Sequence, residues 1–447
     1  MSLKPQPIQA IPDETVRVAR AAFPKGNRYM QMRDEFGTFY QDEQFGDLFP
    51  ERGQPAASPW RLALVTIMQF AENLTDRAAA DAVRARLDWK YALGLDLSDP
   101  GFDYSILSEF RKRLLEGGAE QRLFELMLEQ FQARGLLKAR GRQRTDSTHV
   151  LAAVRGLNRL ELVGETLRYA LNSLAVTAPE WLKRQVPTEW YERYGQPITD
   201  FRLPRTLDAR RALADQIGRD GFTLFASLSS PAAPPWLRHL PAVETLRRVW
   251  IQQFVVLEGQ LRWRQTEELP PGERLIQSPY DVEARYSKKR QTEWVGYKVH
   301  LTESCEADLP HLITNIETTA ATTTDYEMTP TVHAHLGQRE VLPKEHFVDT
   351  GYITADQLVD SQKVYGVELV GPVQTEHSWQ ARANEGFATG DFVIDWQAQQ
   401  ATCPRGQISR KWRVEHLPQQ AAELHIRFAP SDCQACPVRT KCTKSAT

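Results

Sequence analysis

Hydrophobic and polar positions divide the chain into a helical first part, a second helical stretch and several β-rich segments. Prolines interrupt residues 1–50, which predicts short helices and loops there. The segment "SPWRLALVTIMQFAENLTDRAAADAVRARLDWKYALGL" then places apolar residues at helical spacing behind a Ser-Pro helix start. "DYSILSEFRKRLLEGGAEQRLFELMLEQFQARGLL" continues this pattern. We therefore expect a compact helical domain over residues 50–136.

The spacing of apolar residues is no longer helical at "RQRTDSTHVLAAV", a short β-branched segment that predicts a strand around Gln143–Val150. Helical signals dominate residues 155–260, and strand signals return in "TEWVGYKVHLTESC" and "LPHLITNIETTAA". A helix over "YEMTPTVHAHLG", a strand in "EHFVDTGY", a short helix before "SQKVYG" and a strand in "VELVGPV" follow. "GDFVIDWQAQQATCPRG" and "AELHIRFAPSDCQACP" read as hairpins.

Without the helical stretch, two or three antiparallel strands precede alternating strands and helices, which predicts a mixed α/β sheet. The expected parts are a helical N-terminal domain (1–136), an α/β core (137–375) with a large helical insertion (152–280) after its first strand, and a β-rich C-terminal segment (376–447).

Composition changes this picture little. The chain has 447 residues, of which 41% are hydrophobic, as in ordinary globular proteins. It has no apolar run of about 18 residues and no signal-peptide pattern at its start, so we expect a cytoplasmic protein without a membrane partner.

Charge is unevenly distributed, although the net charge is only −2. A run without acids carries Arg134, Lys138, Arg140, Arg142 and Arg144. "RYSKKR" adds Lys288, Lys289 and Arg290, and from residue 403 onward there are eight Lys and Arg against three Asp and Glu. One such cluster is as consistent with a solvated surface as with DNA, but three favour contacts to phosphate.

Two acids stand at the ends of apolar strand segments, Asp146 in "TDST" and Asp349 in "FVDTG". Each could simply cap a turn. If the two strands are neighbours, however, the carboxylates could share divalent cations for an in-line phosphoryl displacement, and magnesium suits such a site. His149 could face the same site, but we interpret it as structural. The remaining histidines in the core show no metal-ligand spacing: His300, His311, His333, His335 and His346.

Four of the five cysteines fall near the end of the sequence. Cys433 and Cys436 have the spacing of a chelating pair, and Cys442 and Cys403 complete four thiolates, enough for a tetrahedral structural zinc site. Reduced, unligated cysteines are the alternative. Cys305 is interpreted as a small core residue.

The chain resembles the DDE transposases of bacterial insertion sequences in "LDWKYALGL", "GFDYSILSEFRKRL", "TDSTHV", "LNRLELVGETLRYALN", "ARYSKKRQTEWVGYKVHLTESC" and "FVDTGY". The resemblance runs from about residue 40 onward. It implies a ribonuclease-H-like core that cuts and joins double-stranded DNA with two Mg²⁺ ions, acting as a homo-oligomer on transposon ends. It also implies that Asp146 and Asp349 are the first two of three catalytic acids.

The third acid of similar transposases lies in a pattern of Tyr, two residues, Arg, three residues, Glu, six residues, Lys. None of the thirteen tyrosines has Arg three positions later. Glu376, Glu385, Glu415 and Glu423 lie in turn- and strand-like surroundings and are not nominated. Our hypothesis is a C-terminally truncated transposase, or the first part of one completed by a separate chain, that shows little or no strand transfer alone.

Two other functions remain open. One is a non-catalytic DNA-binding protein derived from a transposase, acting as a repressor or remnant. The other is a metal-dependent hydrolase of small phosphate esters.

Overall fold

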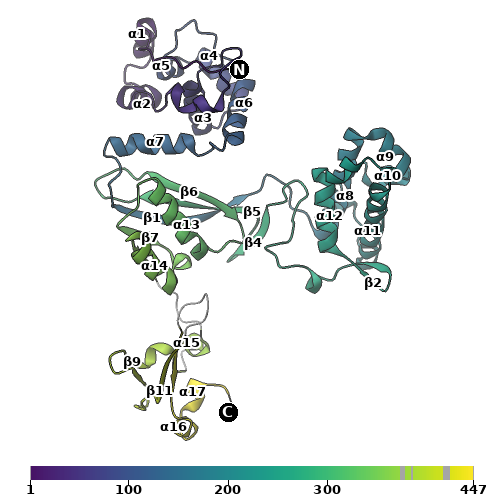
Figure 1. Ribbon diagram of the computed structural model, residues 1–447, viewed down its shortest axis with the longest axis vertical. Coiled ribbons are helices and arrows are strands. Elements are labelled where there is room, and N and C mark those ends of the chain that lie inside the picture. The colour runs from purple at the N-terminus through teal and green to yellow at the C-terminus, as the bar shows by residue number, and fades with distance from the viewer. Residues whose placement is uncertain (1, 373–377, 384–385, 416–422, 446–447) are drawn as a thin grey trace. The chain divides into compact units, whose positions relative to one another are not determined.

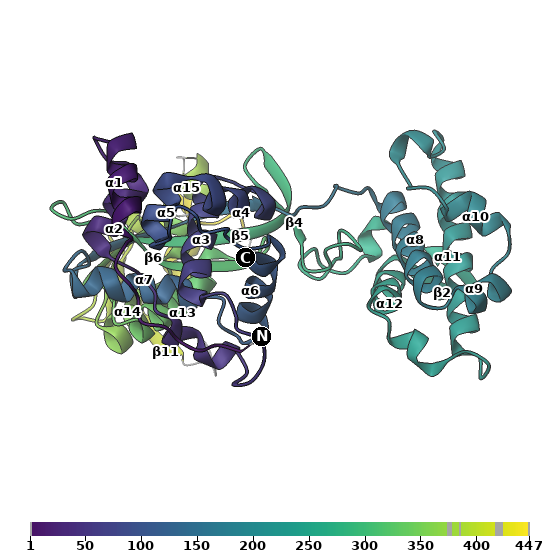
Figure 2. The ribbon, with the colours of Figure 1, turned by 90° about the horizontal axis from the view of Figure 1, so that it is seen from above.

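The computed structural model describes residues 2–372, 378–383, 386–415 and 423–445. The chain forms two compact units, residues 1–139 with 307–310, and residues 140–306 with 311–447 (Figures 1 and 2). Within the described residues, no helix has the length and apolar character needed to cross a membrane.

The first unit is helical, as the apolar spacing predicts. Its core packs large side chains from α3 and α5–α6 around Trp89 and Phe110. Arg86 pairs with Asp88 at 2.6 Å and ties the start of α5 to this core. The elements are α1 (Asp13–Ala22), α2 (Arg28–Phe36), η1 (Asp42–Leu48), α3 (Pro59–Ala71), α4 (Asp76–Ala85), α5 (Leu87–Leu93), α6 (Ser105–Glu116) and α7 (Arg122–Ala133).

The second unit is built on a six-stranded mixed sheet with the order β4-β5-β1-β7-β8, in which β6 also pairs with β5. β1 is antiparallel to β5 and parallel to β7, and β8 is parallel to β7. The strands are β1 (Arg142–Leu151), β4 (Arg285–Lys289), β5 (Thr292–Ser304), β6 (Ile313–Ala320), β7 (Glu345–Val348) and β8 (Glu368–Val370). The mixed α/β sheet expected from the sequence is therefore present.

The β1–β5 pairing depends on Gly296, because a Cβ there would lie 2.1 Å from the Val150 carbonyl oxygen. Gly296 also has a φ of +157°, which L side chains rarely adopt. Close approach at this point fixes the register in which Asp146 faces Leu301.

Two helices, α13 (Asp325–Gln338) and α14 (Ala355–Tyr365), lie beside the sheet near β7 (Figure 1). A capping box between Thr324 and Glu327 starts α13, and Gly366 in the left-handed region ends α14. Buried Met328 on α13 packs with Val348 and other apolar side chains of the sheet. One face of β1 and β7 is thus covered by a helix.

The helical insertion after β1 has its own core around Trp250 and Leu167. Trp250 lies against Gly221, where a Cβ would be 2.3 Å from the indole ring. The insertion contains α8 (Arg159–Thr177), α9 (Pro179–Gln185), α10 (Glu189–Tyr194), η2 (Asp200–Arg202), α11 (Leu207–Ser229), η3 (Pro235–His239), α12 (Pro241–Gln253), β2 (Phe254–Leu257), β3 (Gln260–Trp263) and η4 (Thr266–Glu268).

Two sequence predictions of local structure are wrong, the second only in part. Helix was expected to residue 260, but α12 ends at Gln253 and β2 and β3 form a hairpin through the Glu258-Gly259 turn. "AELHIRFAPSDCQACP" was predicted as hairpin material. Its first part does form one strand of a hairpin, because β12 (Glu423–Arg427) pairs with β11 (Lys411–Glu415), but its second part begins a short helix at Pro430.

The C-terminal segment combines small hairpins with short helices and has little core. In its described residues, only Ala401 and Ala429 are buried hydrophobic residues. Its elements, besides β11 and β12, are α15 (Trp379–Ala383), η6 (Thr389–Asp391), β9 (Val393–Asp395), β10 (Gln400–Thr402), α16 (Pro430–Gln434) and α17 (Arg439–Cys442).

Candidate active site and cysteine cluster

Asp146 and Asp349 lie next to each other on adjacent parallel strands. The last pair in the β1–β7 register is Thr145 with Val348. Asp146 is the next residue of β1, and Asp349 is the first residue after the end of β7. Neighbouring strands are about 4.8 Å apart, and equivalent positions point to the same face. Thr145 and Val348 are buried, whereas both acids are exposed. The two exposed carboxylates therefore follow directly on a buried, paired position of β1 and β7.

Local hydrogen bonds hold both carboxylates. Oδ1 of Asp146 accepts from the backbone N–H of Ser147 at 2.7 Å. Oδ1 of Asp349 accepts from the backbone N–H of Gly351 at 2.9 Å and caps the 3₁₀ turn η5 (Thr350–Tyr352). Neither carboxylate forms an ion pair with a described Lys or Arg. Asp349 does cap a turn, but its remaining oxygen stays available for a ligand.

Asp146 opens onto a cavity of about 470 Å³ whose lining comes from β1, β5 and the start of β6. Arg144 and Glu303 line it and form an ion pair at 2.5 Å. Leu301, opposite Asp146 on β5, contributes an apolar wall. The cavity places a positive and a negative group beside the acid.

A third carboxylate, Asp325 at the start of α13, lies close to the pair. It accepts from Ser147 Oγ at 3.2 Å and forms a mostly buried ion pair with Lys298 at 3.0 Å. A Cβ placed on Gly351 would lie 3.0 Å from Asp325 Oδ2 and 3.1 Å from Asp349 Oδ1. Asp325 was not predicted from the sequence, because a carboxylate at the start of a helix has an ordinary structural explanation. Only its pairing with Lys298 across the fold distinguishes it.

Two buried histidines connect α13 with the strands β1 and β7. His346 on β7 contacts Thr145 Oγ1 at 2.6 Å and His333 at 2.8 Å. Burial lowers the pKa of His346 to about 3 and that of His333 to about 4. Both rings are thus neutral at pH 7 and belong to the packing under the acids.

The other histidines occupy separate positions. His300 contacts the Tyr352 hydroxyl at 2.6 Å, and burial lowers its pKa. Burial, reinforced by Asp325 and the two exposed acids, raises the pKa of Tyr352. His149 lies beside Trp294, with ring centroids 5.3 Å apart.

Most of the basic residues expected to contact DNA already have partners in the protein. Arg142 pairs with Glu345 at 3.0 Å, and Lys288 pairs with Glu293 at 2.6 Å. Side chains of Arg134 and Arg140 donate to backbone carbonyls. Arg142 and Arg144 share the face of β1 that carries Asp146, because they precede it at intervals of two. Exposed positions are also held by Lys138, Lys289 and Arg290.

Of the four glutamates that were not proposed as the third acid, the structure describes Glu415 and Glu423. Glu415 on β11 lies 3.2 Å from Arg413 and 3.6 Å from His425. Glu423 is the first residue of β12, and Glu376 and Glu385 lie outside the described residues. Within the described parts of the chain, no group of three or more His, Cys, Asp or Glu is placed to hold a metal ion.

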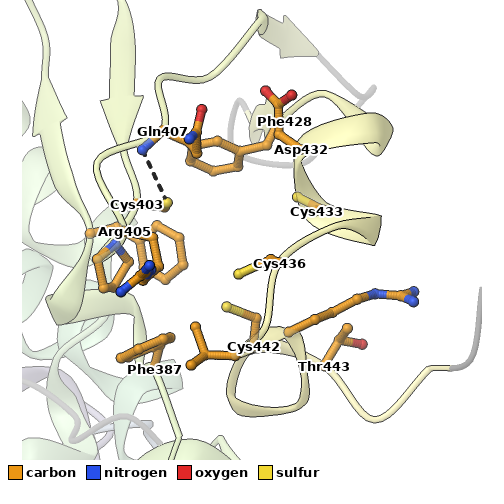
Figure 3. A pocket seen from close by; sticks show the side chains of 14 residues that line it. Phe387, Cys403, Arg405, Gln407, Phe428, Asp432, Cys433, Cys436, Cys442 and Thr443 are labelled. Atoms are coloured by element: carbon orange, nitrogen blue, oxygen red, sulfur yellow. Dashed lines mark hydrogen bonds between the residues drawn. The ribbon is translucent and has the colours of Figure 1, made fainter.

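Four cysteines of the C-terminal segment, Cys403, Cys433, Cys436 and Cys442, line one cavity of about 150 Å³ (Figure 3). Cys403 stands on one side, in the turn after β10, and the other three come from α16, α17 and the link between them. All four are free thiols. Cys305 follows β5 and has no part in this cavity.

Comparisons with known proteins give two family matches. A family model described as a transposase domain (DUF772) matches residues 17–113, within the helical first unit. A model described as a transposase DDE domain matches residues 402–447, which include all four cysteines of the cavity. Searches of curated proteins and of solved structures found no match.

Proposed function

Because the chain belongs to the DDE transposases of insertion sequences, we propose that it binds the DNA ends of its element and that Asp146 and Asp349 form its phosphoryl-transfer site. The observation that carries this proposal is the position of the two acids, side by side at consecutive register points of parallel strands. An isolated turn cap would not need a second carboxylate at the neighbouring position.

The sheet topology supports a ribonuclease-H-like core. Three antiparallel strands, β6, β5 and β1, are followed by β7 and β8, which run parallel to β1. The acids occupy β1 and the end of β7, at the centre of this order. Rigid neighbouring strands would keep the carboxylates in place during the reaction without further ordering.

The two acids fit a divalent cation such as Mg²⁺, which commonly uses one or two carboxylates and takes its other ligands from water and substrate phosphate. When bound, such ions would activate the attacking oxygen and stabilise the leaving one. The role of Asp146 and Asp349 is to supply negative charge at a fixed spacing. Arg142 and Arg144, on the same face, would attract the DNA backbone toward them.

Lys298 and Asp325 are assigned a positioning role in this site. The pair holds Ser147, which follows Asp146, and reaches the turn of Asp349 through Gly351. The Lys298 ammonium also cancels the charge of Asp325, so that a third anion does not repel the first two.

The helical N-terminal part, residues 1–136, would recognise the element ends, and two or more copies of the chain would pair them in the nucleoid. Lys138, Lys288, Lys289 and Arg290 are further candidates for phosphate contacts. Their contribution would be electrostatic and therefore strongly dependent on salt concentration.

A second candidate function is DNA binding without chemistry, as in a repressor or remnant. It is favoured by the finding that no group of three or more His, Cys, Asp or Glu among the described residues is placed to hold a metal ion. A site with two ligands would position the attacking group poorly. We therefore expect the 447-residue chain alone to bind DNA but to cleave it weakly or not at all.

The test uses the full chain and DNA fragments that flank its own coding sequence. Binding is measured at several salt concentrations, and strand cleavage is measured with Mg²⁺ or Mn²⁺. Asp146→Asn and Asp349→Asn should keep binding and abolish any cleavage, while Asp360→Asn, an exposed acid on α14, serves as the matched control. Binding without cleavage in the parent chain would support the second candidate. No salt-dependent DNA binding would reject both.

A further inference from the structure

The C-terminal segment has a structure that its own hydrophobic burial does not explain. Two alanines are the only buried hydrophobic residues among those described after residue 378. Several large apolar side chains are exposed instead, Val393 by 70% and Trp396 by 68%. Small folds with so little core usually need a disulfide or a metal ion to remain folded. Since all the cysteines are free thiols, a disulfide does not fill this role here.

The four thiols converge from separate pieces of the segment. Cys403 belongs to the turn after β10, Cys433 to α16 and Cys442 to the end of α17, with Cys436 in between (Figure 3). They are the sulfur-bearing lining of one otherwise largely aromatic and aliphatic cavity. An ion at its centre would connect elements that are up to 39 positions apart in the sequence.

We propose that Cys403, Cys433, Cys436 and Cys442 bind one structural Zn²⁺ ion, which clamps the turn after β10 to the α16–α17 helices. Four thiolates at about 2.3 Å from a tetrahedral zinc are the usual closed structural site. As the side chains stand, no three of them are within binding range of one point. The ion would therefore draw the side chains from both sides of the cavity toward one point, and the ordering of the segment is coupled to metal binding.

The turn of Cys403 is already shaped as one half of such a site. The backbone N–H of Gln407 donates to Cys403 Sγ at 3.4 Å, and the backbone N–H of Cys403 donates to the Gln407 carbonyl at 2.9 Å. Gly406 has a φ of +79°, which closes this turn without strain. An N–H donor to sulfur fixes the orientation of a ligating thiolate and disperses its charge.

The surroundings also fit the charge of the proposed site. A zinc ion with four thiolates carries a net charge of −2. Arg405 and Arg439 line the cavity, with Asp432 as the one acid in the lining. The positive charges of the two arginines would offset part of this negative charge.

The first test is the metal content of the full chain, produced with zinc in the growth medium and purified with a reductant. We expect one zinc ion per chain in the parent and in Cys305→Ser, the matched control for losing a thiol outside the cavity. In Cys433→Ser/Cys436→Ser, zinc should fall to background. Cys403→Ser, which leaves three ligands, should weaken zinc binding at least tenfold.

A second measurement guards against variants that do not fold. The unsubstituted chain, stripped of metal, is titrated with Co²⁺ and should develop the visible absorption bands of tetrahedral thiolate coordination, which Zn²⁺ then removes. Absence of zinc and of these bands would overturn the proposal, as would iron with sulfide in place of zinc, or full zinc retention in the double variant. None of these readouts depends on DNA chemistry, so failure here leaves the proposed function untouched.

Discussion

The acidic pair and the cysteine cluster bring their side chains together by different means. Asp146 and Asp349 stand on strands that are hydrogen-bonded to each other and covered on one face by α13, so the main chain determines their spacing. The four cysteines come from a turn and two short helices with almost nothing buried between them. A ligand is optional for the geometry of the first site. In the second, the proposed zinc ion would take the place of the missing core.

The largest expected difference between the two regions appears when metal is removed. Withdrawing zinc from the reduced chain should raise amide hydrogen exchange in residues 400–415 and 423–442 by about a hundredfold or more, because metal binding supplies most of their folding free energy. Exchange in β1 and β5 should not change. Hydrogen exchange with mass detection measures both regions in one sample. Equal protection with and without the metal would show that the segment folds unaided.

Acid, unlike metal removal, should destabilise the sheet. His346 and His333 have pKa values lowered to about 3 and 4, against 6.5 for an unperturbed histidine. Their stabilising contribution is therefore complete above pH 6.5 and is lost as the pH falls toward those values. When the pH falls from 7 to 5, we expect the free energy of unfolding of the sheet to decrease by about 2 to 4 kcal/mol.

The measurement is the urea dependence of amide exchange in β1 and β7 at the two pH values. His333→Gln/His346→Gln should remove most of the pH dependence, whereas His239→Gln, at an exposed position, should preserve it. An unchanged pH dependence in the double variant would assign the acid sensitivity to other groups.

A smaller effect, on the affinity for Mn²⁺, should show whether Asp325 and Lys298 influence the two acids through their charge or through packing. In Asp325→Asn, the Lys298 ammonium loses its partner and should weaken Mn²⁺ binding at Asp146 and Asp349 about three- to tenfold. In Lys298→Met, the uncompensated Asp325 should strengthen it by a similar factor. Mn²⁺ titrations followed by electron paramagnetic resonance measure both. Weakening in both variants would mean that the pair acts only through packing.

The sequence predicts the acidic pair and the cysteine cluster to different extents, because their side chains are brought together by different means. The strand of Asp146 and the strand before Asp349 are visible as short apolar runs, and the mixed sheet follows from their order. Their adjacency depends on long-range pairing across the insertion, which no local pattern encodes. Asp325, the first residue of α13, was not predicted for the same reason, since its partner Lys298 lies on β5.

In the C-terminal segment, the spacing of Cys433 and Cys436 predicted a metal-binding pair, whereas the strands and helices could not be predicted from local patterns. Its short strands have too few residues for a clear period, and β12 finds its partner β11 beyond its own sequence window. Likewise, the β2–β3 hairpin was hidden because "FVVLEGQLRW" continues the apolar content of the preceding helix.

Mn²⁺ binding to the zinc-loaded full chain tests the central claim most directly, because it reports on the acidic pair without requiring DNA or a third acid. We predict saturable binding in the parent chain and in Asp360→Asn, and its loss in Asp146→Asn and in Asp349→Asn alike, since the two carboxylates share the ion. Parent-like binding in either of the last two variants would contradict a shared metal site on β1 and β7.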